Sequence, residues 1–160
     1  MTTMTPPPQM RPATTADYPG VARLLEDSGL PTAGVAELLQ GHAADFLVAE
    51  AGDGQLIGAA GLEVCRDDAL LRSVAVRPQW RQHGIGRDLV RLLIDEAERR
   101  GLRSLYLLTT AAEHYFPRFG FRAIDRSAVP ASIAATVEFR SACPASAIVM
   151  TRSLAGRGET

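Results

Sequence analysis

Short apolar runs bounded by turn residues alternate along this chain with longer stretches in which apolar residues recur every three or four positions. The first pattern predicts strands and the second predicts helices. Four early strands are expected at Met10–Pro12, Phe46–Glu50, Gln55–Val64 and Ala69–Val76. Two early helices are expected, one from a cap at Thr14 or Thr15 to about Asp27 and one over Ala33–Gln40.

The second half of the chain begins with the clearest helical pattern. From Gly84 to Arg100 the apolar residues at helical spacing are Ile85, Leu89, Leu92, Leu93 and Ala97. Further strands are expected at Leu102–Leu108, Phe121–Asp125 and Ala145–Thr151. A capping box at Thr110–Glu113 predicts a short helix, and the pattern over Val129–Arg140 is ambiguous, with helix as one reading. A strand, a crossover helix and a further strand in this order predict a mixed α/β fold with a parallel strand pair.

Composition limits the class of protein. With 160 residues, 46% of them hydrophobic and 22% charged, we expect one globular domain over 10–154, a disordered leader at 1–9 and a tail at 155–160. The net charge of −1 gives no general attraction to nucleic acid. No apolar run is long enough to span a membrane, and residues 1–9 lack the apolar core of a signal peptide, so a cytoplasmic protein is expected.

The two cysteines, Cys65 and Cys143, lie far apart and match no metal-ligand spacing. We therefore expect reduced thiols, no disulfide framework and no bound metal. Expected partners exclude nucleic acid and membranes, and a homodimer is left open.

The segment with the most specific chemistry joins the strand Ala69–Val76 to the helix that starts at Gly84. It reads S-V-A-V-R-P-Q-W-R-Q-H-G-I-G-R-D-L-V, and it places Arg81 and two glycines before a helix N-terminus. Such a terminus has unpaired backbone N–H groups that bind phosphate oxygens. A Rossmann fingerprint would need a third glycine where Leu89 stands, and the Gly-Lys-Ser/Thr of a P-loop is absent. The alternative is a turn that only connects a strand to a helix.

These residues, together with the later pair Gly120-Phe121, make the chain resemble the GCN5-related N-acetyltransferase (GNAT) superfamily over about Met10 to Thr151. The resemblance implies the GNAT fold, a mixed and mostly antiparallel sheet flanked by helices, with a parallel strand pair that splays at the acetyl-CoA site. In the family this turn wraps the pyrophosphate of acetyl-CoA. The implied pyrophosphate contacts are Arg81, Gln82, His83, Gly84, Ile85, Gly86 and Arg87. Val74, Ala75 and Val76 would hold the pantetheine arm through their backbone, and Thr109 is expected among the acetyl-CoA contacts.

In this family an amine attacks the thioester directly, which calls for a base, an oxyanion donor and an acid for the thiolate. Glu63 is the predicted base, and its alternative is an exposed glutamate at a strand end. The family's usual tyrosine acid corresponds to Phe116, so Tyr115 is the candidate acid, and its alternative is a half-buried tyrosine. Without an acid the thiolate leaves unassisted or takes a proton from water.

Arg72 lies in mid-strand, where a charge is costly unless it is paired or faces a cleft. It is predicted to bind a carboxylate of the acceptor, with Glu138 and Arg140 as a second polar patch. The alternative for Arg72 is a salt bridge to Asp67, to Asp68 or to a neighbouring strand.

Three segments, L-L-R-S-V-A-V, L-Y-L-L-T-T and E-F-R-S-A-C-P-A-S-A, resemble the GNAT branch encoded beside arsenic-resistance genes. The resemblance implies an amino-acid-like acceptor, with an arsenic-containing amino acid among the candidates. The leading hypothesis is an acetyl-CoA-dependent N-acetyltransferase acting on a small amine. The alternatives are a non-catalytic acyl-CoA-binding module and a protein N-terminal acetyltransferase.

Overall fold

The computed structural model describes residues 7–42, 45–142 and 146–154. The chain divides into two compact units. The first contains Met1–Gly61 and Ser73–Leu93, and the second contains Leu62–Arg72 and Ile94–Thr160. The expected single domain over 10–154 stays a prediction, and the predicted leader lies mostly, and the predicted tail entirely, outside the described residues.

The first unit pairs its strands in the order β1-β2-β3-β4. These strands are β1 (Gln9–Pro12), β2 (Phe46–Glu50), β3 (Leu56–Cys65) and β4 (Asp68–Val76), of which β3 and β4 continue into the second unit. β1 and β2 are antiparallel, as are β2 and β3. The predicted strand positions are confirmed to within a residue or so.

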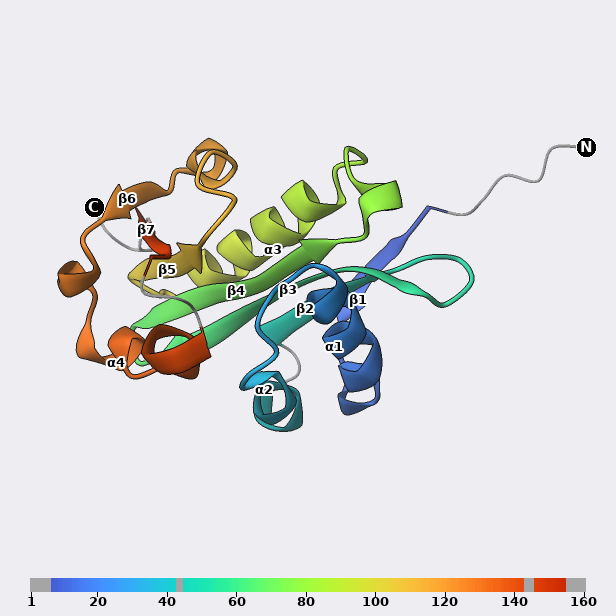
Figure 1. Ribbon diagram of the computed structural model, residues 1–160, viewed down its shortest axis with the longest axis horizontal. Helices are drawn as coiled ribbons and strands as arrows, with labels where there is room; N and C mark the ends of the chain where they lie inside the picture. The colour runs from blue at the N-terminus through green and yellow to red at the C-terminus, as the bar shows by residue number, and fades with distance from the viewer. Residues whose placement is uncertain (1–6, 43–44, 143–145, 155–160) are drawn as a thin grey trace, which may run out of the picture. The chain divides into compact units, whose positions relative to one another are not determined.

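Two helices, α1 (Tyr18–Asp27) and α2 (Val35–His42), lie beside these strands (Figure 1). The core between them contains Val21, Leu24, Leu25, Val35, Leu39, Phe46, Val48, Leu56, Ala59 and Ala75. Gly61 of β3 faces the ring of Phe46, which occupies the space where a Cβ on Gly61 would lie. α1 buries Val21, Leu24 and Leu25, and in α2 Leu38 is only half-buried.

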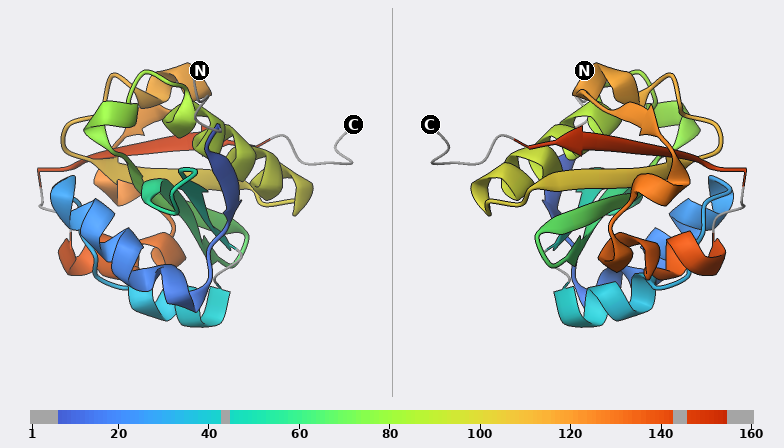
Figure 2. Two further views of the ribbon diagram at one scale, coloured as in Figure 1. Left: turned by 90° about the vertical axis from the view of Figure 1, so that its right-hand side faces the viewer. Right: turned by 90° about the vertical axis from the view of Figure 1, so that its left-hand side faces the viewer.

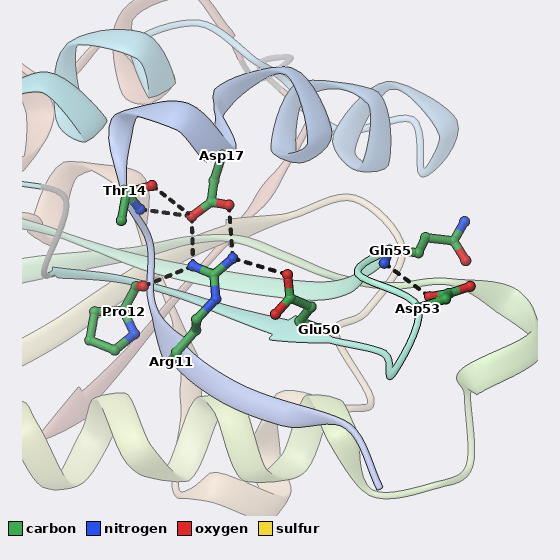
Figure 3. A network of polar contacts seen from close by, with 7 residues as sticks. All are labelled: Arg11, Pro12, Thr14, Asp17, Glu50, Asp53 and Gln55. Atoms are coloured by element: carbon green, nitrogen blue, oxygen red, sulfur yellow. Dashed lines mark hydrogen bonds and ion pairs between the residues drawn. The ribbon is translucent and has the colours of Figure 1, made fainter. Parts of the chain in front are cut away.

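An ion-pair network fixes the start of the first unit (Figure 3). Arg11 of β1 donates hydrogen bonds to both carboxylate oxygens of Asp17, at 2.8 and 2.9 Å, and lies 3.4 Å from Glu50. The backbone N–H of Thr14 donates to the same Asp17 carboxylate at 2.8 Å. The hydrogen bonds from Arg11 lower the pKa of Asp17, and those to Asp17 raise the pKa of Arg11.

The helix α3 (Ile85–Arg99) starts in the first unit and ends in the second. Its first turns pack on β3, because a Cβ on Gly58 would lie 2.9 Å from Ile85 and 3.2 Å from Leu89. The prediction that Leu92 belongs to the apolar face is wrong, since Leu92 is 46% exposed. Val90 and Ile94 are buried instead, so the buried stripe is rotated away from Leu92 toward these two residues.

The second unit pairs its strands in the order β4-β5-β7-β6. β5 (Ser104–Thr109) is parallel to β4, with Asp68–Leu70 opposite Ser104–Tyr106. β7 (Ile148–Ser153) runs antiparallel to β5 and to β6 (Arg122–Ile124), and Figure 2 shows β7 alongside β5 in both views. The predicted fold class, a mixed sheet with a parallel pair and flanking helices, is confirmed.

The segment between β5 and β7 departs most from the sequence-based expectations. The predicted capping box at Thr110–Glu113 is wrong, because no helix starts there: residues 110–115 form bends and turns, and the Thr109 hydroxyl accepts the Ala112 N–H at 2.9 Å. The short helix is a 3₁₀ turn over Phe116–Phe119. The ambiguous segment forms α4 (Ala131–Ala134) and a one-turn π-helix over Glu138–Ala142. The last strand starts at Ile148, later than predicted.

Candidate functional site

A bend in β4 precedes the segment that carries the phosphate-binding pattern. Ser73 has φ = +60°, a conformation that costs a non-glycine residue strain and is enriched at functional sites. Beyond it the side chain of Ala75 is buried in the first core, while Val74 and Val76 are half-buried. The side chain of Ala75 therefore has a packing role, and its backbone role stays a prediction.

The turn after β4 is built by local hydrogen bonds and left-handed backbone. Pro78–Trp80 forms a 3₁₀ turn, and Gln82 and Gly84 follow with φ of 69° and 80°. Arg81 donates from Nε to the Val76 carbonyl at 3.1 Å, and His83 Nδ1 lies 2.9 Å from the Arg81 carbonyl. The side chains of Arg81, Gln82 and His83 are exposed, so they are accessible to a ligand.

A second contact fixes where this turn begins. The Arg77 N–H donates to the Ile57 carbonyl of β3 at 2.8 Å, and its guanidinium pairs with Asp27, the last residue of α1, at 2.6 Å. Sequence reasoning missed this pair, because Asp27 and Arg77 are 50 positions apart. The pair ties the end of β4 to both β3 and α1.

The start of α3 leaves backbone donors open. The Asp88 N–H donates to the Gly84 carbonyl at 3.0 Å, which is the first hydrogen bond of the helix. In the described part of the chain no backbone acceptor meets the N–H groups of residues 84–87. Arg87 folds over Gly84, where a Cβ would lie 2.6 Å from its guanidinium. Bare N–H groups, a helix dipole and nearby guanidinium groups suit a phosphate.

In the second unit, Arg72 forms the centre of a buried charge cluster with Glu63 of β3 and Glu138 of the π-helix. The Arg72 side chain has no exposed surface; its Nη1 lies 3.2 Å from Glu63 and its Nε lies 3.1 Å from Glu138. The pair with Glu63 is also a hydrogen bond, whereas Oε2 of Glu138 lies out of hydrogen-bond alignment. The alternative of a bridge to a neighbouring strand is therefore seen, while Asp68 pairs with Arg103 at 2.8 Å.

Glu63 is the most exposed member of this cluster, with 23% of its side-chain surface accessible. Its carboxylate is engaged by Arg72, and its role as a base stays a prediction. Burial, and after it the negative charges of Glu63 and Asp68, together raise the pKa of the nearby Cys65 thiol to about 11. Cys65 is therefore a protonated, unreactive thiol at neutral pH. Cys143 lies outside the described residues.

The region of the predicted acid is an aromatic cluster. Phe116, at the position of the family's usual tyrosine, is buried against Phe119 and Phe121 with ring centroids 6.5 and 5.9 Å away. Tyr115 is half-buried, contacts Phe116 and Phe119 edge-on, and has the guanidinium of Arg118 4.5 Å above its ring. Phe116 is thus a core residue, and the role of Tyr115 as an acid stays a prediction.

The remaining predicted residues are dispersed. Arg140 is exposed on the π-helix, in contrast to the buried Glu138 two positions earlier. Thr109, at the end of β5, uses its hydroxyl to hold the Ala112 N–H. His114 is exposed.

The described ranges contain neither a membrane-spanning helix nor a side-chain cluster that suits a metal ion. No helix there is long and apolar enough to cross a membrane. Across the same residues, no three His, Cys, Asp or Glu side chains are grouped so that they could hold a metal ion.

These features together define the class of protein. β4 carries the left-handed residue Ser73, a glycine turn and an open helix start follow it, and β4 pairs in parallel with β5. The chain belongs to the acetyltransferase (GNAT) family, which matches residues 10–121. It is similar to an amino-acid acetyltransferase of Aeromonas salmonicida, with 32% identity over 127 residues that cover 76% of this chain and 28% of the relative. The chain spans about a third or less of the length of the curated relatives compared here.

Solved structures agree with this assignment. N-acetylglutamate synthase from Neisseria gonorrhoeae, complexed with coenzyme A and N-acetyl-glutamate, superposes with a TM-score of 0.77 and 25% identity, covering 97% of this chain and 36% of that one. The Mycobacterium tuberculosis protein Rv2747, solved in complex with CoA, superposes with a TM-score of 0.76 and 26% identity, covering 92% of this chain and all of that one.

Proposed function

We propose that this protein transfers the acetyl group of acetyl-CoA to the amine of a small, amino-acid-like acceptor. The observation that carries the proposal is the open start of α3 behind the left-handed residues Gln82 and Gly84, in a chain of the acetyltransferase family. The similar structures solved with coenzyme A support the donor.

The donor would be held mainly by backbone. The N–H groups of Gln82 through Arg87 would bind the pyrophosphate, and Arg81 and Arg87 would add charge-assisted hydrogen bonds. Val74, Ala75 and Val76 would hold the pantetheine arm through their N–H and C=O groups, and Thr109 would contribute from β5. The splaying of β4 from β5 at this site stays a prediction.

The reaction forms one bond and breaks one. The acceptor nitrogen bonds to the thioester carbonyl carbon, the C–S bond breaks, the nitrogen loses a proton and the CoA sulfur gains one. A lysine-like amine is neutral in fewer than about one molecule in a thousand at pH 7, and an α-amine in about one in ten. A base therefore matters most for the more basic acceptors.

Glu63 is proposed as that base and Tyr115 as the acid. If Glu63 acts as the base, Glu63→Gln lowers kcat far more at pH 7 than at pH 9, where more of the acceptor is already neutral. A uniform loss across pH would contradict this role. If Tyr115 is the acid, Tyr115→Phe lowers kcat with little change in the KM for acetyl-CoA or for the acceptor. An unchanged kcat would contradict this role and would mean that the thiolate departs without help from Tyr115.

The acceptor class is supported by the relatives, which are named amino-acid acetyltransferases, and by the bound N-acetyl-glutamate of the Neisseria enzyme. Arg72, Glu138 and Arg140 are the proposed acceptor-side residues. These relatives are named for amino-acid acceptors and give no support for the arsenic-linked branch. An arsenic-containing amino acid therefore stays a prediction, which the assay described below also tests.

The test is CoA release from acetyl-CoA by the purified protein with a panel of amino acids, amino-acid amides, simple amines, N-terminal peptides and an arsenic-containing amino acid. We expect release above the hydrolysis background with a small acceptor. Faster release with peptides would favour a protein N-terminal acetyltransferase.

A second function is favoured by one observation, the buried phenylalanine at the usual acid position. A non-catalytic acyl-CoA-binding module would show CoA binding by calorimetry, but it would form no CoA from acetyl-CoA with any amine. Calorimetry and the amine panel together therefore separate the two functions.

A further inference from the structure

We propose that Glu138 is a specificity-determining residue: it occupies, from within the chain, the place at Arg72 that an acceptor carboxylate would take. The acceptor is then an amine that carries an uncharged group, such as an amide or ester, where an amino acid carries its α-carboxylate. This inference rests on the proposed acetyl transfer and narrows its substrate class.

The guanidinium of Arg72 is enclosed by other groups of the protein. A guanidinium binds carboxylates through the donors of its planar fork. In Arg72 the Nη1 end contacts Glu63 at 3.2 Å and the Nε edge contacts Glu138 at 3.1 Å. Because none of the Arg72 side chain is exposed, a carboxylate from solvent would have to displace a group that covers it, and the two glutamates already contact its Nη1 and Nε.

The charge of the cluster also opposes an acceptor carboxylate. The cluster contains two carboxylates and one guanidinium, so it carries one net negative charge when all three groups are ionised. Glu63 also acts on its surroundings, as its contribution to the raised pKa of the Cys65 thiol indicates. A third carboxylate would meet this negative charge, whereas an amine, neutral or protonated, would not be repelled.

Glu138 is held in place by its surroundings. Its side chain is 8% exposed, and it is followed by Phe139, which is buried in the second core with Leu70, Ile133 and Val149. The Thr136 hydroxyl accepts the Phe139 N–H at 3.4 Å, and the Thr136 carbonyl accepts the Arg140 N–H at 3.0 Å. Glu138 is therefore a fixed part of the site, and an acceptor carboxylate would have to displace a packed residue.

The test compares acids with their amides. L-glutamate is paired with L-isoglutamine and L-alanine with L-alaninamide, and kcat/KM is measured for CoA release by wild type, Glu138→Gln and Glu96→Gln. Glu96 pairs with Arg99 and Arg100 on the surface of α3, so its substitution is the matched loss of one carboxylate elsewhere. Dividing each variant by wild type cancels the difference in amine basicity between acid and amide.

We expect Glu138→Gln to raise the acid-to-amide ratio of kcat/KM about tenfold or more, because it removes the competing charge and releases part of the guanidinium. Glu96→Gln should leave the ratio unchanged. A ratio that Glu138→Gln leaves unmoved or lowers would overturn the inference while the transferase activity stands. If none of the amines supports CoA release above background, the proposed function is wrong, and this inference fails with it.

If Glu138→Gln does not fold, the wild-type protein gives the decision. Propionate and propionamide differ only in the group at issue and carry no amine. We expect propionate to inhibit acetyl transfer no more strongly than propionamide. Inhibition by propionate at a tenfold lower concentration would show that Arg72 accepts an external carboxylate, and would overturn the inference.

Discussion

The segment that joins β4 to α3 and the cluster around Arg72 bind charge in opposite ways. The first, in one unit, offers backbone N–H groups and exposed arginines from consecutive residues. The second, in the other unit, buries an arginine between two glutamates that lie 9 and 66 positions away in sequence, as residues 63, 72 and 138. The start of α3 therefore has N–H groups open to an external anion, whereas Nη1 and Nε of Arg72 already contact carboxylates of the chain itself.

The largest expected effect separates the two arginine environments. Arg72→Leu leaves the buried Glu138 and the half-buried Glu63 without their cation and should lower the free energy of unfolding by about 3–5 kcal/mol. Arg81→Leu, at an exposed arginine of the donor segment, should change stability little and weaken CoA binding. Urea unfolding and calorimetry measure the two quantities.

The comparison has its own control within the cluster. Adding Glu63→Gln and Glu138→Gln to Arg72→Leu removes the stranded charges, so part of the lost stability should return. Equal stability of Arg72→Leu and wild type would contradict the burial argument.

The next effect isolates the backbone contribution of the donor segment. Gly84 and Gly101 both have left-handed backbone, with φ of +80° and +76°. Alanine at either position should therefore cost about 1–2 kcal/mol of stability. Gly84→Ala should also weaken CoA binding tenfold or more, because its Cβ would displace Arg87 from the helix start. CoA affinity that falls equally in Gly101→Ala would remove the special role of Gly84.

A smaller effect compares the buried Arg72 with Arg11, whose side chain is 32% exposed. Hydrogen bonds from Arg11 lower the pKa of Asp17 below its ordinary value near 3.8. Asp17 thus contributes stability that is complete above that ordinary value and is lost as the pH falls through the lowered one. Asp17→Asn should flatten the acid limb of the stability profile below about pH 4, measured by thermal unfolding. An unchanged acid limb would contradict the pairing.

The smallest effect reports the negative field beside Glu63. With its pKa raised to about 11, Cys65 should react very slowly with iodoacetamide at pH 7.5 and faster as the pH rises toward 11. The background is Cys143→Ser, so that one thiol is observed. Removing the Glu63 charge with Glu63→Gln should speed the reaction, while Glu96→Gln should leave it unchanged.

The fold was largely readable from the sequence because its elements have regular periods. The strands Phe46–Glu50 and Ala69–Val76 and the helix from Gly84 were predicted within about one residue of their observed bounds. Leu92 was misplaced because Val90, Leu92 and Ile94 are all apolar, and periodicity alone does not tell which edge of the stripe the fold buries. The segment 110–142 was poorly predicted because its short 3₁₀, α and π turns are fixed by tertiary contacts, such as the Phe116–Phe121 pair, rather than by local preference.

By itself the sequence determined the mixed α/β fold, the helix start at Gly84 and the class of ligand that such a start binds. These features depend on consecutive residues: a strand, a turn that needs left-handed backbone and an amphipathic helix. Only the tertiary structure decided what surrounds Arg72, because a buried charge takes its partners from whichever strands and turns the fold brings to it. The sequence identified Arg72 as an anion-binding arginine, and the structure identified two of the chain's own glutamates as the anions it contacts.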